Sequence, residues 1–361
     1  MAPLNRFDKR LENLSGEIWT KVAQIDELKG QWTAGMRLSP QALGRLRRSV
    51  LVTSAGASTR IEGARLSDEE VEKLIRGVAI QKFTDRDKQE VQGYYELLQN
   101  VYDSWTDLRF NENLILHFHK ELLKYVEKDQ LHSGAYKKKE NKVHMVDADG
   151  KTIEVLFNTT PAYLAPKEVQ ELVAWTTHAL DQKTHHPLLL IGHFVVEFLK
   201  IHPFEDGNGR LSRVLTNFLL LKAGYAHIPY VSHEKLIEDN KADYYVALRQ
   251  SQKTLFVSGS GTEAAPAEDI RPWLHFFLTL ALKQSQMAVH LLSGEDIEKL
   301  LSEKQLAVWR YLQDVSDAAP GTIAQKTGVV RPTVNQVLQK LLQLKRVERL
   351  GQGRSIRYRK L

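Results

Sequence analysis

The sequence predicts an all-α fold that carries one small β-hairpin and a separate basic region at its C-terminal end. Apolar residues recur every three or four positions, as between Leu11 and Leu28, which is the period of an amphipathic helix. The period becomes two only in residues 142–157, where two short β-prone runs flank the turn signal Asp149-Gly150. Residues 320–361 carry ten basic side chains and one acidic side chain, a net charge of +9.

Composition narrows the classes of protein further. The chain has 361 residues, of which 42% are hydrophobic and 26% charged, so it can bury a large core and is longer than most single domains. It shows no run of 18 apolar residues and no secretory leader, so we expect no membrane partner and a cytoplasmic location. The absence of cysteine excludes disulfides, cysteine–zinc sites and thiol nucleophiles. The whole chain carries +6, which leaves about −3 outside residues 320–361 and predicts different partners for the two parts.

Boundary signals place the helices along the chain. A pattern from Leu43 to Ile61 ends at Gly63, which suits the positive φ of a helix C-terminal cap. Residues 67–70, Ser-Asp-Glu-Glu, form a capping box that opens the next helix. Further helices are expected over residues 91–130, 166–180, 187–201, 211–221 and 270–292. The predicted regions are residues 1–90, 91–292 and 293–361.

Two of these helices, over residues 187–201 and 211–221, are apolar nearly all round and belong in the centre of a domain. They are joined by a polar, glycine-rich loop. The loop and the start of the second helix, residues 202–213, read His-Pro-Phe-Glu-Asp-Gly-Asn-Gly-Arg-Leu-Ser-Arg. Such a loop between two buried helices makes a rigid platform for a functional site.

The side chains of residues 202–213 suit phosphate chemistry. His202 precedes a proline, so it is expected at the end of the first helix, where a neutral imidazole can accept a proton. Asp206 can hold Mg²⁺, which prefers oxygen ligands and phosphate co-ligands. Gly207-Asn208-Gly209 allows close approach of an anion to backbone amides at a helix N-terminus. Arg210 and Arg213 share a helix face and can clamp phosphate oxygens. Each feature alone has an ordinary structural explanation, but their joint occurrence favours a functional site.

Residues 202–213 match the motif of the Fic family, His-x-Phe-x-Asp/Glu-Gly-Asn-Gly-Arg-x-x-Arg, at every specified position. The resemblance extends over about residues 40–290. Fic proteins are mostly helical and typically transfer AMP from ATP to a hydroxyl side chain of a target protein. The resemblance implies that His202 deprotonates a Ser, Thr or Tyr hydroxyl, that Asp206 binds Mg²⁺, and that Arg213 meets the γ-phosphate. It also implies that the α- and β-phosphates are cradled by Gly207, Asn208, Gly209 and Arg210.

A second stretch, Ser58-Thr59-Arg60-Ile61-Glu62-Gly63, looks like the inhibitory element of this family, Ser/Thr-x-x-x-Glu-Gly/Asn. Taken alone it is a helix C-terminus with an exposed carboxylate. The resemblance implies that Glu62 pairs with Arg213, takes the place of the γ-phosphate and leaves ATP in an unproductive pose. One carboxylate can do this because it competes for the same paired donors. We therefore expect autoinhibition that involves Ser58, Glu62 and Gly63.

The hairpin of residues 143–157 resembles the flap that aligns a target segment by strand pairing, with an ordinary surface hairpin as the alternative. Val143, at its start, is expected among the nucleotide-binding residues. The basic residue before the flap is Lys137 or Lys138, where the family usually has arginine. Tyr244 and Gln252 fall where relatives place adenine-contacting groups, although buried packing explains the tyrosine equally well.

The basic C-terminal region resembles a winged helix. Three helical patterns, at residues 303–312, 321–328 and 332–342, precede two short strands that flank Gly351-Gln352-Gly353-Arg354. In that family the second helix of the helix-turn-helix enters the major groove of DNA and the wing touches the backbone or minor groove. The expected readers of bases or phosphates are Arg331, Thr333, Asn335 and Gln336 on the helix, with Arg354 and Arg357 on the wing. The alternative is a winged helix used for protein contacts or dimerisation.

The sequence therefore predicts a protein adenylyltransferase that uses ATP and Mg²⁺ and that Glu62 restrains. One alternative is a DNA-binding regulator whose Fic-like region senses a nucleotide. Others are removal of AMP from a modified target, or transfer of phosphate, UMP or phosphocholine by the same site. Asp206 and Arg213 favour ATP as the donor of AMP. A homodimer is plausible for both parts of the chain.

Overall fold

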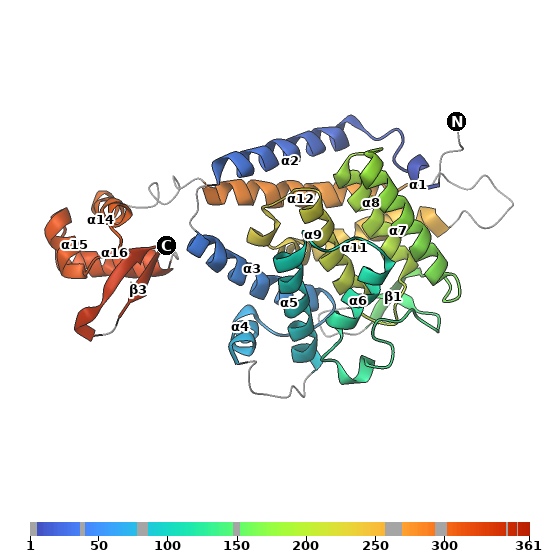
Figure 1. Ribbon diagram of the computed structural model, residues 1–361, viewed down its shortest axis with the longest axis horizontal. Helices are drawn as coiled ribbons and strands as arrows, with labels where there is room; N and C mark the ends of the chain where they lie inside the picture. The colour runs from blue at the N-terminus through green and yellow to red at the C-terminus, as the bar shows by residue number, and fades with distance from the viewer. Residues whose placement is uncertain are drawn as a thin grey trace. The chain divides into compact units, whose positions relative to one another are not determined.

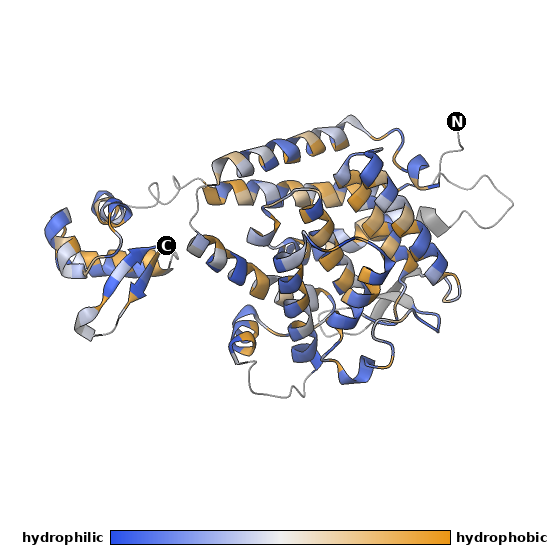
Figure 2. Ribbon diagram, in the orientation of Figure 1, coloured by the Kyte–Doolittle hydropathy of each residue, from blue (hydrophilic) through white to orange (hydrophobic). Residues whose placement is uncertain are grey.

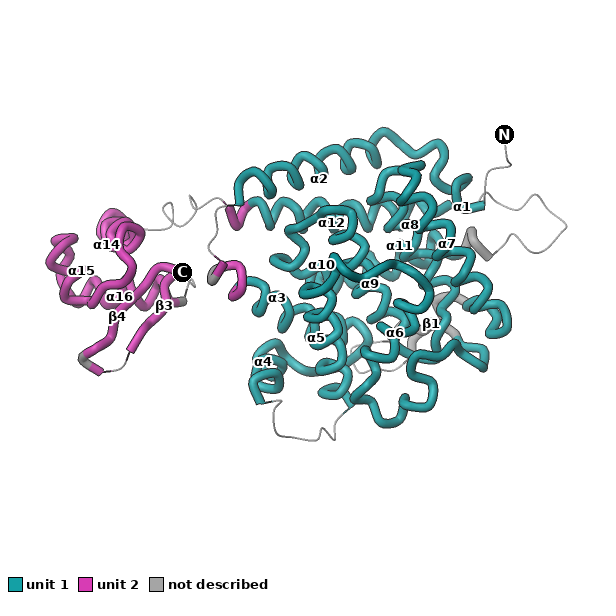
Figure 3. The backbone as a smooth tube through the Cα atoms, viewed as in Figure 1, with its two compact units in different colours: residues 1–36, 46–289 teal, residues 37–45, 290–361 magenta. Residues whose placement is uncertain are grey.

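The chain folds into two units, each with its own apolar core. The computed structural model describes residues 6–36, 40–77, 86–146, 152–256, 269–292, 302–343, 346–351 and 353–361. One unit comprises residues 1–36 and 46–289, and the other comprises residues 37–45 and 290–361 (Figure 3). Helices dominate both units, and the described strands form two small antiparallel sheets, which confirms the predicted fold class. No described helix combines the length and the apolar character that crossing a bilayer demands.

The first unit is built from helices and one hairpin (Figure 1). Its elements are α1 (Arg6–Lys9), α2 (Gly16–Gly35), α3 (Pro40–Ile61, whose first residues are assigned to the other unit), α4 (Asp68–Gly77), α5 (Arg86–Ser104), α6 (Glu112–Leu122), η1 (Glu127–Asp129), β1 (Lys142–Val146), β2 (Thr152–Asn158), α7 (Ala165–Gln182), α8 (Pro187–Ile201), α9 (Asn208–Lys222), η2 (Ile228–Tyr230), α10 (His233–Asp239), α11 (Lys241–Phe256) and α12 (Arg271–Leu292).

Helix α8 is the centre of this unit. Every residue of α8 after Pro187 is buried, and α9 is buried along most of its length. Apolar colour follows α8 and α12 in Figure 2. Helix α2 runs beside α12 (Figure 1), where Glu17 Oε1 lies 3.5 Å from His275 Nδ1. The N-terminal helices share one apolar core with the later ones, and the predicted boundaries at residues 90 and 292 stay predictions.

Several helix boundaries follow the signals in the sequence. Gly63 has a φ of 104° and ends the turn after α3, as predicted. The capping box is confirmed, because Ser67 N–H donates to Glu70 and Glu70 N–H donates to Ser67 Oγ at 3.3 Å. Helix α9 begins at Asn208, three residues before the predicted start. Leu11 and Leu14 precede α2, because that helix begins only at Gly16.

The predicted hairpin is present. Strands β1 and β2 pair antiparallel with Val143 opposite Phe157, and the register shifts between Val143 and His144 and again between Met145 and Val146. The two shifts are irregularities of the kind that bend a hairpin. The predicted turn at Asp149-Gly150 lies outside the described residues.

The second unit has the element order predicted for a winged helix. It contains α14 (Glu303–Asp314), α15 (Pro320–Thr327), α16 (Arg331–Gln343), β3 (Val347–Leu350), η4 (Gly353–Ser355) and β4 (Arg357–Lys360). Strands β3 and β4 pair antiparallel, and Ala318 adds an isolated bridge to Tyr358. Apolar residues of the three helices, among them Trp309, Ile323 and Leu338, form its own core.

Candidate active site

His202 is the C-terminal cap of α8. Its backbone, with φ 50° and ψ 60°, is left-handed and turns the chain out of the helix. Imidazole Nδ1 lies 3.2 Å from the carbonyl oxygen of Leu199. Because a carbonyl only accepts, Nδ1 carries the hydrogen and Nε2 keeps its lone pair. Burial lowers the pKa of His202 to about 4, and the Lys137 charge acts in the same direction. The ring is therefore neutral near pH 7, as a proton acceptor must be.

The turn between α8 and α9 is closed by Asn208. Its Oδ1 accepts from the Phe204 N–H at 2.9 Å, and its Nδ2 donates to the Phe204 carbonyl at 2.8 Å. Gly207, with φ 80°, is the N-terminal cap of α9. The N–H groups of Asn208, Gly209 and Arg210 lie in the first turn of that helix, where no intrahelical acceptor exists. A phosphate cradle here would thus be made of backbone N–H groups, because the Asn208 side chain serves the loop itself.

Asp206 belongs to a ring of ion pairs. Its Oδ2 accepts from Arg210 Nη2 at 2.7 Å and from Arg86 Nη2 at 2.9 Å. Glu90 closes the ring, because it contacts Arg86 Nε at 2.7 Å and Arg210 Nη1 at 2.9 Å. Burial opposes the charge of Asp206, but Arg210, the Gly207 amide and Arg86 outweigh it and lower its pKa to about 2. Asp206 is therefore ionised, as a metal ligand must be.

Arg213 is held by the stretch predicted to be inhibitory. Its Nη2 donates to Glu62 Oε1 at 2.7 Å and to the Ser58 carbonyl at 2.9 Å, and its Nε donates to Ser58 Oγ at 2.8 Å. The Arg213 side chain is only 2% exposed. Burial opposes the positive charge, yet Glu62 keeps the pKa of Arg213 above its ordinary value. A Cβ at Gly209 would collide with Glu62 Oε1, so the carboxylate lies directly against the first turn of α9.

His119 is a residue of this site that sequence reasoning missed. Its ring stacks on Phe204 with centroids 3.8 Å apart and planes 10° apart. Nε2 donates to the Asp206 carbonyl at 3.0 Å, and Nδ1 accepts from the Gly134 N–H at 2.9 Å. Burial lowers the pKa of His119 to about 4, so the neutral ring fixes the backbone that carries Asp206. Its place in an ordinary amphipathic helix pattern gave no signal for this role.

Lys137, not Lys138, is the basic side chain that faces the loop. Lys138 is exposed, whereas Lys137 Nζ donates to Asn141 Oδ1 and Thr159 Oγ1, both at 2.8 Å, and to the Ile201 carbonyl at 3.2 Å. The Lys137 N–H also donates to the Pro203 carbonyl at 2.8 Å. Burial lowers the pKa of Lys137 to about 8. The lysine thereby ties the base of the β1–β2 hairpin to the loop that begins at His202.

Comparison with known proteins finds a family match over the part of the chain that contains residues 202–213. The family model described as Fic/DOC family matches residues 109–220. Residues 109–220 form a Fic/DOC family domain. The chain is 31% identical over 101 residues to a probable protein adenylyltransferase of Aquifex aeolicus, a match that covers 28% of each chain. It is 29% identical over 164 residues to protein adenylyltransferase Fic of Aedes aegypti, which covers 45% of this chain and 26% of that one. The chain thus matches less than a third of these relatives' own length.

A crystal structure supports the same fold for the Fic domain and its surroundings. A Fic family protein from Desulfovibrio desulfuricans superposes with a TM-score of 0.61 at 24% identity, and the match covers 97% of both chains. A second family model, described as the C-terminal domain of a DIP2311-like transcriptional regulator, matches residues 301–361. Glu62 lies outside the segment matched to the Fic model, so its role depends on the contacts described above.

Tyr244 and Gln252 are placed inside the unit that contains the Fic domain. The Tyr244 ring is 4% exposed and lies 5.8 Å from Trp273 and 5.9 Å from Phe276, centroid to centroid. Gln252 is fully buried, and its Nε2 donates to the Val196 carbonyl at 3.4 Å. Aromatic packing surrounds the Tyr244 ring, and its hydroxyl interacts with the Arg213 guanidinium. Val143 lies in β1, and the structure describes only its backbone pairing.

The predicted DNA-contacting residues lie in the second unit. Arg331, Asn335 and Gln336 are exposed on α16, and Thr333 is half-buried there. Arg357 begins β4 and pairs with Asp317, so its charge is already partly neutralised. Arg354 lies in η4, and its side chain falls outside the described atoms.

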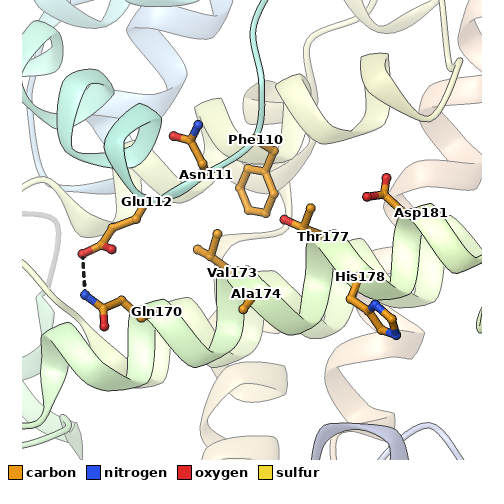
Figure 4. Close-up of a pocket in the computed structure, with 9 residues that line it drawn as sticks. All are labelled: Phe110, Asn111, Glu112, Gln170, Val173, Ala174, Thr177, His178 and Asp181. Carbon is orange, nitrogen blue, oxygen red and sulfur yellow. Dashed lines mark hydrogen bonds between the residues drawn. The ribbon is translucent and has the colours of Figure 1, made fainter.

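One pocket of about 480 Å³ lies away from this chemistry, between the start of α6 and helix α7 (Figure 4). Phe110, Val173 and Ala174 give it apolar surface, and Gln170 donates to Glu112 at 3.2 Å across it. None of its lining residues comes from residues 202–213.

Proposed function

We propose that this chain transfers AMP from ATP to the hydroxyl group of a Ser, Thr or Tyr side chain on a target protein. The Fic domain and the adenylyltransferase relatives support the proposal. The site supports it too, because a neutral imidazole, a helix N-terminus and two arginines lie within residues 202–213. ATP suits this arrangement, since the backbone N–H groups and paired guanidinium donors bind phosphate oxygens.

In the proposed reaction the target hydroxyl gives its proton to His202 Nε2 while its oxygen bonds to the α-phosphorus of ATP. The bond between that phosphorus and the oxygen bridging to the β-phosphate breaks, and pyrophosphate leaves. The first-turn N–H groups of α9 and the Arg210 guanidinium would stabilise the charge that develops on the phosphate oxygens.

Mg²⁺ is the ion that Asp206 would hold. Among the described residues, no three His, Cys, Asp or Glu side chains are grouped in a way that could hold a metal. A single carboxylate with 39% exposure suits an ion that takes its other ligands from phosphate and water. When bound, Mg²⁺ would neutralise phosphate charge.

Restraint by Glu62 is the second part of the proposal. The ion pair of 2.7 Å between Arg213 Nη2 and Glu62 Oε1 is the observation that carries it. Together with Ser58, this pair uses donors of Arg213 that a γ-phosphate would need. An arginine with these bonds is poorly available to ATP. Loss of the Glu62 carboxylate should therefore release the enzyme.

Intact mass spectrometry after incubation with Mg-ATP tests both parts. We expect wild type to modify itself or candidate targets weakly, Glu62→Gly to add AMP units readily, and Glu62→Gly combined with His202→Ala to add none. Glu69→Gly is the matched control, because it removes an exposed carboxylate of α4 that contacts only Lys73 among the described pairs. If Glu62→Gly and Glu69→Gly label alike, Glu62 is not a restraint. If no variant gains AMP, adenylyl transfer is wrong.

The same measurement distinguishes the neighbouring reactions. A mass gain equal to phosphate, UMP or phosphocholine, obtained with the corresponding donor, would show that the site transfers that group instead of AMP. Loss of AMP from a modified target, dependent on Glu62, would show that this carboxylate assists a water molecule in the reverse direction.

Duplex DNA binding by residues 301–361 is a second candidate function. It is favoured by the match to a transcriptional regulator domain and by exposed polar side chains on α16. Anisotropy of labelled duplex DNA over a range of salt should show an affinity that falls steeply with salt. Arg331→Ala should weaken binding, while Lys167→Ala, an exposed lysine of α7, should not. Absence of salt-dependent binding would leave protein contacts as the role of this unit.

A further inference from the structure

Arg86 is a second arginine at Asp206, beside Arg210, and it lies far from the Fic motif in sequence. It is the first residue of α5, and its Nη2 contacts Asp206 Oδ2 at 2.9 Å and Asp129 Oδ2 at 3.0 Å. Its Nε contacts Glu90 at 2.7 Å. The guanidinium therefore bridges three carboxylates, one of which is the predicted metal ligand.

The two arginines on Asp206 differ in how easily they can leave it. Arg210 is 2% exposed, and its remaining partner would be Glu90 alone. Arg86 is 47% exposed and keeps Glu90 and Asp129 when it releases Asp206. Removing one of three partners from a half-exposed guanidinium costs less than removing one of two partners from a buried guanidinium. Arg86 is thus the arginine that can release Asp206 more easily.

A metal ion at Asp206 would need the same carboxylate that Arg86 uses. Arg86 and Arg210 both contact Oδ2 of Asp206. Mg²⁺ prefers oxygen ligands, and the two guanidinium groups already on this carboxylate would repel a further positive charge. The Arg86–Asp206 contact would therefore weaken the binding of a metal at Asp206.

We infer that Arg86 competes with a metal ion for the Asp206 carboxylate, so that Arg86 raises the metal concentration needed for nucleotide binding. This inference rests on the proposed function. It assigns Arg86 a positioning role that acts through Asp206, and not a contact with phosphate.

Calorimetric titration with a non-cleavable α,β-methylene ATP analogue tests the inference at several fixed Mn²⁺ concentrations, in the Glu62→Gly background. Arg86→Ala should lower the half-saturating Mn²⁺ concentration about two- to fivefold, the effect expected from one partly exposed ion pair. Arg86→Lys, which keeps a charge, should lie between. Arg76→Ala is the control, because it removes an exposed arginine paired with Glu72 on α4.

Three outcomes overturn the inference. One is an unchanged Mn²⁺ dependence in Arg86→Ala and Arg86→Lys that retain wild-type melting temperatures. Another is equal weakening of nucleotide binding with and without Mn²⁺, which would make Arg86 a phosphate contact. The third is an Arg86→Ala effect of the same size when Asp206 is replaced by Asn, since the effect must pass through that carboxylate. Absence of nucleotide binding in every variant, Glu62→Gly included, would reject the proposed function as well.

Discussion

Arg213 is the residue whose surroundings connect the two informative stretches of the sequence. Its guanidinium donates hydrogen bonds to a carboxylate, a carbonyl and a hydroxyl of α3 and the turn after it, although 151 positions separate Glu62 from Arg213. Its Nη1 makes no hydrogen bond among the described atoms, although the Tyr244 hydroxyl also interacts with this guanidinium. A buried charged donor without an acceptor is costly, so this atom favours an incoming anion. The proposed restraint would therefore hold a group that is already suited to phosphate.

The Ser58 hydroxyl should contribute to the restraint less than the Glu62 carboxylate does. Ser58→Ala removes the acceptor of Arg213 Nε but leaves the Ser58 carbonyl and Glu62 in place. One hydrogen bond to a charged group contributes about 1.5–3 kcal/mol, so the variant should label faster than wild type but more slowly than Glu62→Gly. Ser54→Ala is the control, since Ser54 lies one turn earlier and bonds only Ser232 among the described contacts. Equal labelling by Ser58→Ala and Ser54→Ala would contradict the prediction.

At the scale of elements, the end of α3 is fastened to two other helices by Arg60. Its guanidinium donates to Glu238 of α10, to Asp68 of α4 and to the Leu66 carbonyl. A Cβ at Gly56 would lie 2.6 Å from Arg60 Nη1, so this glycine makes room for the guanidinium against α3. The carboxylate of Glu62 follows two residues later, which makes its position depend on this junction.

Arg60→Ala should therefore loosen the restraint without touching the nucleotide site. We expect labelling above wild type, sensitive to His202, together with a lower melting temperature because several hydrogen bonds to a charged group are lost. Arg47→Ala is a matched control on the same helix, where Arg47 pairs with the half-exposed Asp103. Gel-based labelling with radioactive ATP measures the difference. Unchanged labelling in a variant that melts earlier would show that Glu62 is placed independently of Arg60.

The boundaries and contacts of the helices show which features the sequence could predict and which it could not. Helix α8 has the predicted bounds, because its apolar run and its flanking prolines mark both ends. Helix α9 begins earlier than predicted, since apolar periodicity marks only buried turns and its first turn is polar. Arg86 and His119 could not be found, because they meet Asp206 across 120 and 87 positions. Lys137 and Lys138 are adjacent in the sequence, and only the packing of the folded chain shows that Lys137 is the buried one.

At the scale of the whole molecule, residues of each unit bury their apolar side chains among themselves. One core draws on residues between Phe7 and Ala281 and the other on residues between Val308 and Val347. Every residue predicted for nucleotide chemistry lies in the first unit, and every predicted DNA contact lies in the second. The net charge of +9 in residues 320–361, against about −3 in the rest of the chain, predicts different partners for the two parts.

Histidines with a lowered pKa make the stability of the first unit depend on pH. Burial lowers the pKa of His119, His202 and His227 to about 4 and that of His193 to about 3. The unfolded chain binds protons at these groups near pH 6.5, whereas the folded chain binds them only near pH 4 or below. Between those values the unfolded state holds more protons, so the free energy of unfolding must fall as the pH is lowered.

We therefore expect the melting temperature to decline steadily from pH 6.5 to pH 4, before the carboxylates of Asp206 and Glu197, both with a pKa near 2, take up protons. His227→Gln should show a shallower decline, because His227 is one of the four groups and its ring makes a single described hydrogen bond, with the Ser285 hydroxyl. Calorimetry in buffers of equal ionic strength measures both slopes. A melting temperature that stays constant over this range would mean that these rings accept protons in the folded chain. The assignment of a neutral His202 ring would then be wrong.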